Sequence, residues 1–185
     1  MWKALATAVL IIAGGAACPE SVDHARAGTA LFEIAGTAGV IDGDTISVMW
    51  HGAEHKVRLE GIDALEAGQQ CGAPPWACGS QASELLIRLA DKKDVTCRII
   101  GTDIYKRWLG QCWLAAASAH TLATSLNAVM VDSGLAFAFR RYSLAYVAHE
   151  EAAHALRRGA WSGDFQFPWD YRAERRQQLR SRRRN

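Results

Sequence analysis

Residues 40–66 read VIDGDTISVMWHGAEHKVRLEGIDALE, and this stretch decides the fold. Two short runs, 45–50 and 55–59, have the composition of strands, and His51-Gly52-Ala53 between them is typical of a hairpin turn. We therefore predict a pair of antiparallel strands in the middle of the stretch.

The segments on either side extend the same pattern. Residues 32–40 contain β-branched residues and glycine, which predicts a strand before the hairpin. Residues 93–100 and 108–114 predict a second hairpin around Gly101-Thr102-Asp103. The chain thus has about five short strands.

Helices are expected between and after these strands. The three predicted helices span residues 80–90, 125–132 and 144–157. Ser80 can cap the first, and Gly134 and Gly159 are typical stops for the second and third. Strands with helices inserted later indicate a small α+β domain built on a five-stranded barrel.

Length and composition restrict the class of protein. The chain has 185 residues, 50% hydrophobic and 22% charged, so it can bury the core of one domain. These figures exclude a disordered chain, a collagen-like fibre and a large multidomain enzyme. The predicted division is a leader over 1–27, a folded domain over 28–172 and a basic tail over 173–185.

The N-terminus has the pattern of a secretory signal peptide. Lys3 precedes an uncharged apolar run over residues 4–17, which is shorter than the roughly 20 residues that a bilayer span needs. Cleavage could follow Ala17 or Ala27, both small residues. We therefore expect a secreted or periplasmic protein in an oxidising compartment.

The five cysteines fall into two groups. Cys18 lies at the leader boundary, where it is lost with the leader or carries a lipid anchor. The other four are Cys71, Cys78, Cys97 and Cys112. Four cysteines allow three pairings, and their spacing is too long for the close pairs that zinc prefers.

Charge is unevenly distributed along the chain. Residues 18–171 carry a net charge of −5, whereas the segment from Arg172 to the end has seven Arg and one Glu. An acidic body does not hold DNA by bulk charge. We expect the segment 172–185 to be solvated and mobile.

Acidic and basic residues gather in three segments: 40–45, 57–66 and 103–107. The first holds Asp42 and Asp44, although an Asp-Gly turn needs only one aspartate. An EF-hand loop requires glutamate at its twelfth position. Counting from Asp42 leads to Ala53 and counting from Asp44 leads to His55, so this is not an EF-hand.

Together the three segments resemble the motifs of the staphylococcal nuclease family, in the same order. The matching pieces are Val-Ile-Asp-Gly-Asp-Thr (40–45), Val-Arg-Leu-x-Gly-Ile-Asp-Ala-x-Glu (57–66) and Asp-x-Tyr-x-Arg (103–107). The resemblance covers about residues 32–172. It implies an OB-type five-stranded β-barrel with three α-helices, in agreement with the α+β prediction.

The resemblance also implies an activity, the Ca²⁺-dependent hydrolysis of phosphodiester bonds in DNA and RNA. Asp44 and Asp63 would hold the ion through carboxylates, with the backbone carbonyl of Ala64 as a further ligand. No protein partner is implied, and the protein is expected to be a monomer.

The remaining site residues follow from the same resemblance. Glu66 would act as general base or orient the attacking water, and Arg58 and Arg107 would clamp the phosphate. Tyr105 and Tyr142 would contact the nucleotide.

This sequence also departs from the family pattern. Leu65 stands where the family usually has proline, and Lys106 stands where it usually has glycine. The four cysteines are additional, and we predict the bonds Cys71–Cys78 across a tight loop and Cys97–Cys112 between the arms of the second hairpin.

Two other functions remain open from sequence alone. One is a catalytically weak or inactive OB-type barrel that binds nucleic acid in the cell envelope. The other is a structural envelope protein anchored through Cys18. Retention of the five charged residues that the family uses, Asp44, Asp63, Glu66, Arg58 and Arg107, favours the nuclease.

Overall fold

The structure is a computed structural model that describes residues 30–115 and 123–184. The predicted leader over 1–27 and the lipid-anchor hypothesis at Cys18 lie outside the described residues. Within them, no helix is long and apolar enough to span a membrane.

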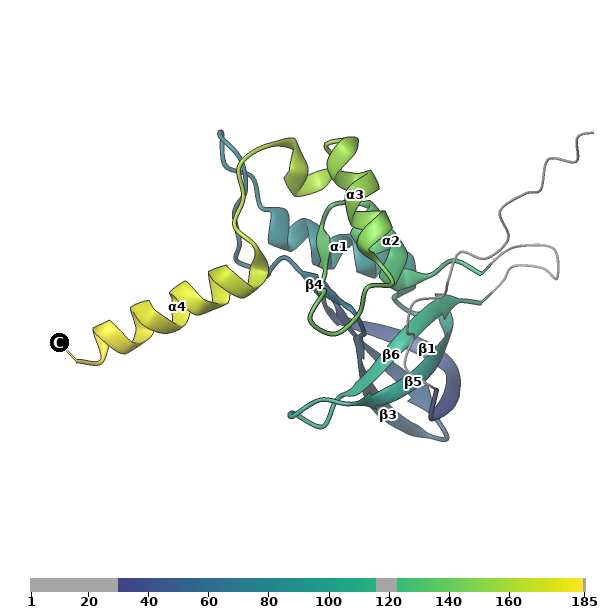
Figure 1. The fold of residues 1–185 in the computed structure, drawn as a ribbon. Helices are drawn as coiled ribbons and strands as arrows, with labels where there is room; N and C mark the ends of the chain where they lie inside the picture. Colours follow the sequence, from purple (N-terminus) through teal and green to yellow (C-terminus); the bar gives the residue numbers. More distant parts are fainter. Residues whose placement is uncertain (1–29, 116–122, 185) are drawn as a thin grey trace, which may run out of the picture.

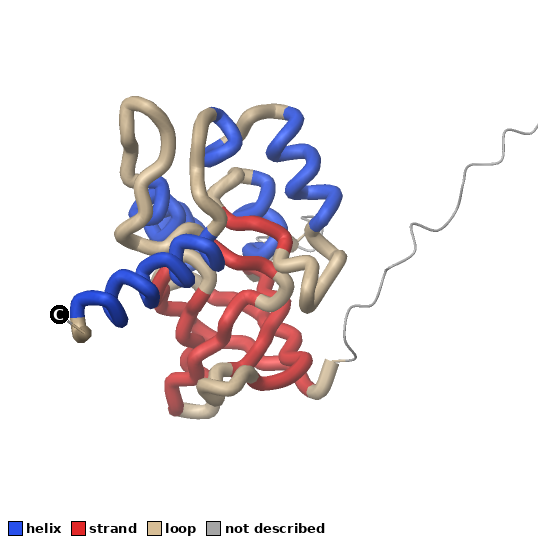
Figure 2. Tube along the Cα trace, turned by 60° about the vertical axis from the view of Figure 1, so that its left-hand side comes forward, coloured by secondary structure: helices blue, strands red, loops and turns tan. Residues whose placement is uncertain are grey.

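Five strands form a closed barrel (Figures 1 and 2). They are β1 (Phe32–Asp42), β2 (Thr45–Trp50), β3 (Ala53–Leu59), β5 (Asp94–Thr102) and β6 (Trp108–Leu114), in the order β1-β2-β3-β6-β5. All neighbours are antiparallel except β3 and β6. The predicted barrel is confirmed.

A two-stranded sheet, which the sequence did not predict, joins the barrel to the helices. It pairs β4 (Ile62–Ala64) with β7 (Ala136–Ala138), and Asp63 lies opposite Phe137. Every residue of both strands is buried. This sheet sets the position of Asp63 relative to the helical layer.

Four α-helices and a 3₁₀ turn complete the described chain. They are α1 (Cys78–Ala90), α2 (Leu126–Asp132), α3 (Val147–Ala155), η1 (Gly159–Ser162) and α4 (Pro168–Arg182). Ser125 caps α2 by accepting a bond from the Ala128 N–H at 3.2 Å. Gly134 and Gly159 have φ angles of 68° and 52°, the left-handed conformation expected after a helix.

Two helix boundaries differ from the prediction. The helix expected to begin at a capping Ser80 begins at Cys78, so Ser80 lies inside it and its hydroxyl donates to the Ala67 carbonyl. The helix predicted over 144–157 is shorter, because it spans only Val147–Ala155 and residues 144–146 form a bend and a turn instead.

The three predicted helices are present, and residues 168–182 form a fourth helix, α4, in the segment that was expected to be a solvated tail. Pro168 occupies the first turn, Asp170 follows it, and Arg180 and Arg182 lie in the last turn, which are favourable helix start and stop signals. The boundary predicted at residue 172 therefore falls inside α4, which projects away from the body in Figure 1.

Both predicted disulfides are present. Cys97 and Cys112 are directly paired residues of β5 and β6, and Cys71–Cys78 closes the loop that leads into α1. The first cross-link joins two barrel strands. The second ties the segment after Glu66 to the start of a helix.

Candidate active site

Asp44 and Asp63 come from different sheets and lie side by side. Asp44 follows the Asp42-Gly43 turn between β1 and β2, and the Asp42 carboxylate accepts a bond from the Asp44 N–H at 3.1 Å. A Cβ at Gly43 would lie 2.9 Å from the Ala64 Cβ, so glycine allows this turn to approach β4. The Ala64 N–H then donates to Asp44 Oδ2 at 3.1 Å.

Arg58 bridges the two aspartates. Its Nη1 lies 2.8 Å from Asp44 Oδ1 and its Nη2 lies 2.8 Å from Asp63 Oδ1. Arg58 reaches both because β3 pairs it with Thr45, the residue after Asp44. Since Asp44 and Asp63 are 5% and 0% exposed, these carboxylates need a cationic partner.

Burial raises the pKa of Asp44 to about 7, and the nearby Asp42 and Asp63 charges add to this effect. The Arg58 guanidinium and the Ala64 N–H act in the opposite direction and do not cancel it. The environment of this carboxylate is therefore short of positive charge.

Glu66 lies just beyond β4, in a loop held by Gln69. The Gln69 side chain accepts a bond from the Glu66 N–H at 3.2 Å, and the Gln69 N–H donates to the Glu66 carbonyl at 2.7 Å. Gln69 is 1% exposed, and the neighbouring Leu65 is also buried. These contacts order the loop although Leu65 stands where the family has proline.

Arg172 of α4 is the residue of this site that the sequence prediction missed. Its Nη1 lies 3.0 Å from Asp63 Oδ1 and 2.7 Å from Glu66 Oε1, and its Nη2 lies 2.6 Å from Asp63 Oδ2. Arg172 is more than 100 residues from both partners along the chain. No local pattern predicts these contacts, although Pro168 and Asp170 do indicate the start of the helix that carries Arg172.

Arg107 lies apart from this cluster, in the β5–β6 hairpin. Its Nε and Nη2 each lie 2.7 Å from Asp103 Oδ2, and across residues 30–115 and 123–184 it forms no ion pair with Asp44, Asp63 or Glu66. Lys106 has a φ of 63°, so this position has the left-handed conformation that suits the family's glycine.

Asp103 organises this hairpin. Its Oδ1 accepts bonds from the Tyr105 and Arg107 N–H groups, both at 2.9 Å. Burial alone would raise the pKa of Asp103, but the bonds from Arg107 and Tyr105 outweigh it and lower the pKa. Asp103 therefore stays ionised and aims Arg107.

The two tyrosines predicted to contact the nucleotide are both exposed. Tyr105 lies in the β5–β6 hairpin with the Arg107 guanidinium 5.6 Å from its ring. Tyr142 follows β7 and packs edge-on against Phe139 at 4.8 Å. Neither side chain is a core aromatic.

The site has the donor chemistry of a hard-cation site without a preformed cage. Among the described residues, no group of three or more His, Cys, Asp or Glu side chains is arranged to hold a metal ion. Asp44 and Asp63 converge, but guanidinium groups lie between them and beside Glu66.

Comparison with known proteins decides the family. The model of the family described as staphylococcal nuclease homologue matches residues 56–163, more than half of the chain. The chain belongs to the staphylococcal nuclease family. The matched range contains Arg58, Asp63, Glu66 and Arg107, whereas Asp44 and α4 lie outside it.

Several relatives of this staphylococcal nuclease homologue match most of its length. It is 36% identical over 140 residues to a micrococcal nuclease of Shigella flexneri, covering 72% of this chain and 76% of that protein. It is 34% identical to the protein ParB of Escherichia coli, covering 73% and 76%. It is 32% identical to an uncharacterized endonuclease of Escherichia coli O157:H7, covering 72% and 80%.

Proposed function

We propose that this protein is a nuclease that hydrolyses phosphodiester bonds of DNA, RNA or both with the help of Ca²⁺. The observation that carries the proposal is the convergence of three carboxylates: Asp44 and Asp63 share Arg58, and Asp63 and Glu66 share Arg172. Carboxylates bind hard cations and activate water, and guanidinium groups bind phosphate. The family and the relatives named nuclease and endonuclease support this reaction.

The residues present fit Ca²⁺. Asp44 and Asp63 offer carboxylate oxygens, and the backbone carbonyl of Ala64 would add a third oxygen; calcium accepts such ligands together with waters. The raised pKa of Asp44, caused first by burial, indicates a place where added positive charge is favourable. When bound, the ion would supply a Lewis acid that polarises a phosphate oxygen.

Glu66 would activate the attacking water. Its side chain is 39% exposed, so water can reach the carboxylate, while the bonds to Gln69 fix its backbone. As the water oxygen forms its bond to phosphorus, its proton passes to Glu66 and the bond to the leaving sugar oxygen breaks.

Arg58 and Arg107 would bind the phosphate from two sides. Arg58 starts beside both aspartates on β3, and Arg107 projects from the β5–β6 hairpin with Asp103 as its support. A guanidinium remains charged and donates two parallel bonds to phosphate oxygens. The negative charge that grows on phosphate in the transition state would be stabilised there.

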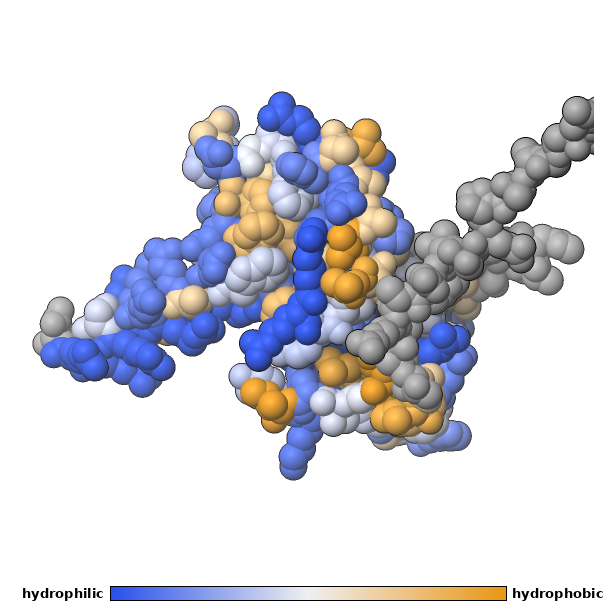
Figure 3. Space-filling view, viewed as in Figure 1, coloured by the Kyte–Doolittle hydropathy of each residue, from blue (hydrophilic) through white to orange (hydrophobic). Residues whose placement is uncertain are grey.

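The exposed groups around the site suit a long anionic substrate. Figure 3 shows α4 as mostly hydrophilic, and its exposed residues include Arg175, Arg176 and Arg180. Tyr105 and Tyr142 are exposed aromatic groups on which bases could stack. A polymer would therefore gain contacts that a single phosphodiester lacks.

We place this nuclease outside the cytoplasm, secreted or in the periplasm. The support is the pair of disulfides, because such bonds persist in oxidising compartments.

Cleavage with and without calcium tests the proposal. Plasmid DNA, single-stranded DNA and RNA are incubated with the purified protein and Ca²⁺, and again with excess chelator. We expect cleavage with calcium and none with the chelator. Binding without cleavage under every metal tried would contradict the proposal and favour a barrel that only holds nucleic acid.

A further inference from the structure

Arg172 contacts Asp63, which the proposed cation would need, and Glu66, the proposed general base. Asp63 Oδ1 accepts bonds from both Arg58 and Arg172, and Asp63 Oδ2 accepts a second bond from Arg172. A carboxylate oxygen has about two lone-pair sites, so Oδ1 has none left. Oδ2 keeps one free site, so a cation bound to Asp63 would lie directly beside two guanidinium charges, and their repulsion favours the departure of one of them.

Of the two guanidinium groups, Arg172 is the one that can leave. Arg58 lies within a barrel strand with a 19% exposed side chain and contacts both aspartates. Arg172 is 32% exposed and extends from α4, which lies outside the family match. Its removal from Asp63 and Glu66 breaks no bond of the barrel.

The attachment of α4 to the body is confined to its start. Pro168 is buried, Trp169 stacks on Phe139 and Phe167 with ring centroids 5.7 and 4.6 Å away, and the Tyr171 hydroxyl donates to the Gly68 carbonyl at 3.1 Å. Residues 174–184 are all exposed.

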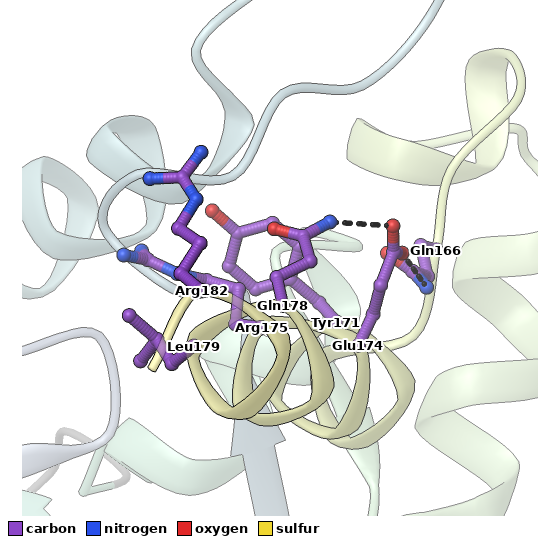
Figure 4. A pocket seen from close by; sticks show the side chains of 7 residues that line it. All are labelled: Gln166, Tyr171, Glu174, Arg175, Gln178, Leu179 and Arg182. Carbon is purple, nitrogen blue, oxygen red and sulfur yellow. Dashed lines mark hydrogen bonds between the residues drawn. The ribbon is translucent and has the colours of Figure 1, made fainter. Parts of the chain in front are cut away.

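Contacts farther along α4 are local. Glu174 accepts bonds from Gln166, just before α4, at 3.1 Å and from Gln178, within α4, at 3.0 Å (Figure 4). Among the described residues, the ion pairs of Arg172 with Asp63 and Glu66 are the only ones that join α4 to the body, and they lie in its second turn.

We propose that Arg172 and the divalent cation compete for Asp63, so that cation binding displaces the Arg172 guanidinium, releases Glu66 and loosens α4. This inference rests on the cation of the proposed function. In the cation-free protein the guanidinium supplies the positive charge that the buried Asp63 requires. A cation ligated by Asp63 supplies that charge instead and repels the guanidinium beside it.

Calcium affinity measured by titration calorimetry on the full chain tests the competition. Arg172→Gln removes the competing group, and Arg176→Gln is the matched control because it removes the same charge from an exposed position of the same helix. Coupling between two ligands is typically about 5–150-fold. We expect Arg172→Gln to bind Ca²⁺ at least about fivefold more tightly than wild type and Arg176→Gln to stay within about twofold.

Hydrogen exchange provides a readout independent of affinity and of activity. In wild type, Ca²⁺ should speed exchange of the amides at 173–178, whereas in Arg172→Gln this exchange should be fast with or without the ion. Arg172→Lys keeps the charge but loses the two-pronged contact, so it should give an intermediate affinity.

The possible failures can be told apart. Equal affinities of Arg172→Gln and Arg176→Gln, with α4 exchange unaffected by Ca²⁺, would overturn the competition while leaving the proposed nuclease intact. Absence of cation binding in all variants would overturn both, and the cleavage assay would then show whether hydrolysis proceeds without calcium.

Discussion

Asn127 on α2 should be one of the most sensitive single positions in the fold. Its amide donates to the Glu60 carbonyl at 2.9 Å and to the Gly110 carbonyl at 3.2 Å, and its Oδ1 accepts from the Cys112 N–H at 3.0 Å. It is 0% exposed. These bonds join α2 to β6 and to the turn that leads into β4 and Asp63.

The cost of Asn127→Ala can be worked from these contacts. Gly110 keeps a second partner, the Glu60 N–H at 2.8 Å, whereas the Glu60 carbonyl and the Cys112 N–H lose their side-chain partner. Each lost bond costs about 1 kcal/mol, and a buried group left unpaired costs up to about 3 kcal/mol. We expect a loss of about 3–5 kcal/mol in the free energy of unfolding.

Urea unfolding followed by circular dichroism measures this loss. The control is Gln81→Ala, which removes an exposed amide from α1 and should stay within about 0.5 kcal/mol of wild type. A loss below about 1 kcal/mol for Asn127→Ala, with an unchanged slope in urea, would refute the reasoning.

Three further predictions concern the Cys97–Cys112 disulfide, the buried Glu60 and Arg107. The disulfide between Cys97 and Cys112, which lie 15 residues apart, restricts the unfolded chain, so replacing both with alanine should lower the free energy of unfolding by about 3 kcal/mol. Urea unfolding measures this, and an unchanged free energy would contradict the reasoning. Burial raises the pKa of Glu60, against a bond from Gln111, so its charging destabilises the fold as pH rises through the folded pKa. Glu60→Gln should therefore have a higher melting temperature than wild type at about pH 8 and the same melting temperature at about pH 4. A difference in melting temperature that does not change with pH would show that the charge of Glu60 is not its cause. Arg107→Ala should lower the cleavage rate by about 10²–10³-fold without changing the melting temperature. The control Arg88→Ala, at an exposed position of α1, should cut at the wild-type rate, and equal cleavage rates for the two variants would exclude Arg107 from the site.

The barrel could be predicted because its strands are long enough to show a pattern. The runs at 45–50 and 108–114 became β2 and β6 with the predicted ends. The strands β4 and β7 have three residues each, too few for any periodicity, and form only because each pairs with the other. The sheet that positions Asp63 was therefore invisible in the sequence.

The site was predictable to the extent that it lies in local motifs. Asp44, Arg58, Asp63 and Glu66 came from two segments whose spacing is preserved, and the structure brings them together. Arg172 could not be found this way, because its partners are set by the packing of Trp169 and Pro168. Charge predicts a solvated segment there, and residues 174–184 are exposed, but the helix signals at Pro168 and Asp170 are needed to predict α4.

The central claim is that Glu66 activates water beside the aspartates to cut phosphodiester bonds. The most direct measurement compares the Ca²⁺-dependent cleavage rates of Glu66→Gln and Glu54→Gln, which make the same chemical change in the site and at an exposed position of β3. We predict that Glu66→Gln loses about 10²–10⁴-fold in rate while Glu54→Gln cuts like wild type. Cleavage by Glu66→Gln at the wild-type rate would contradict the account.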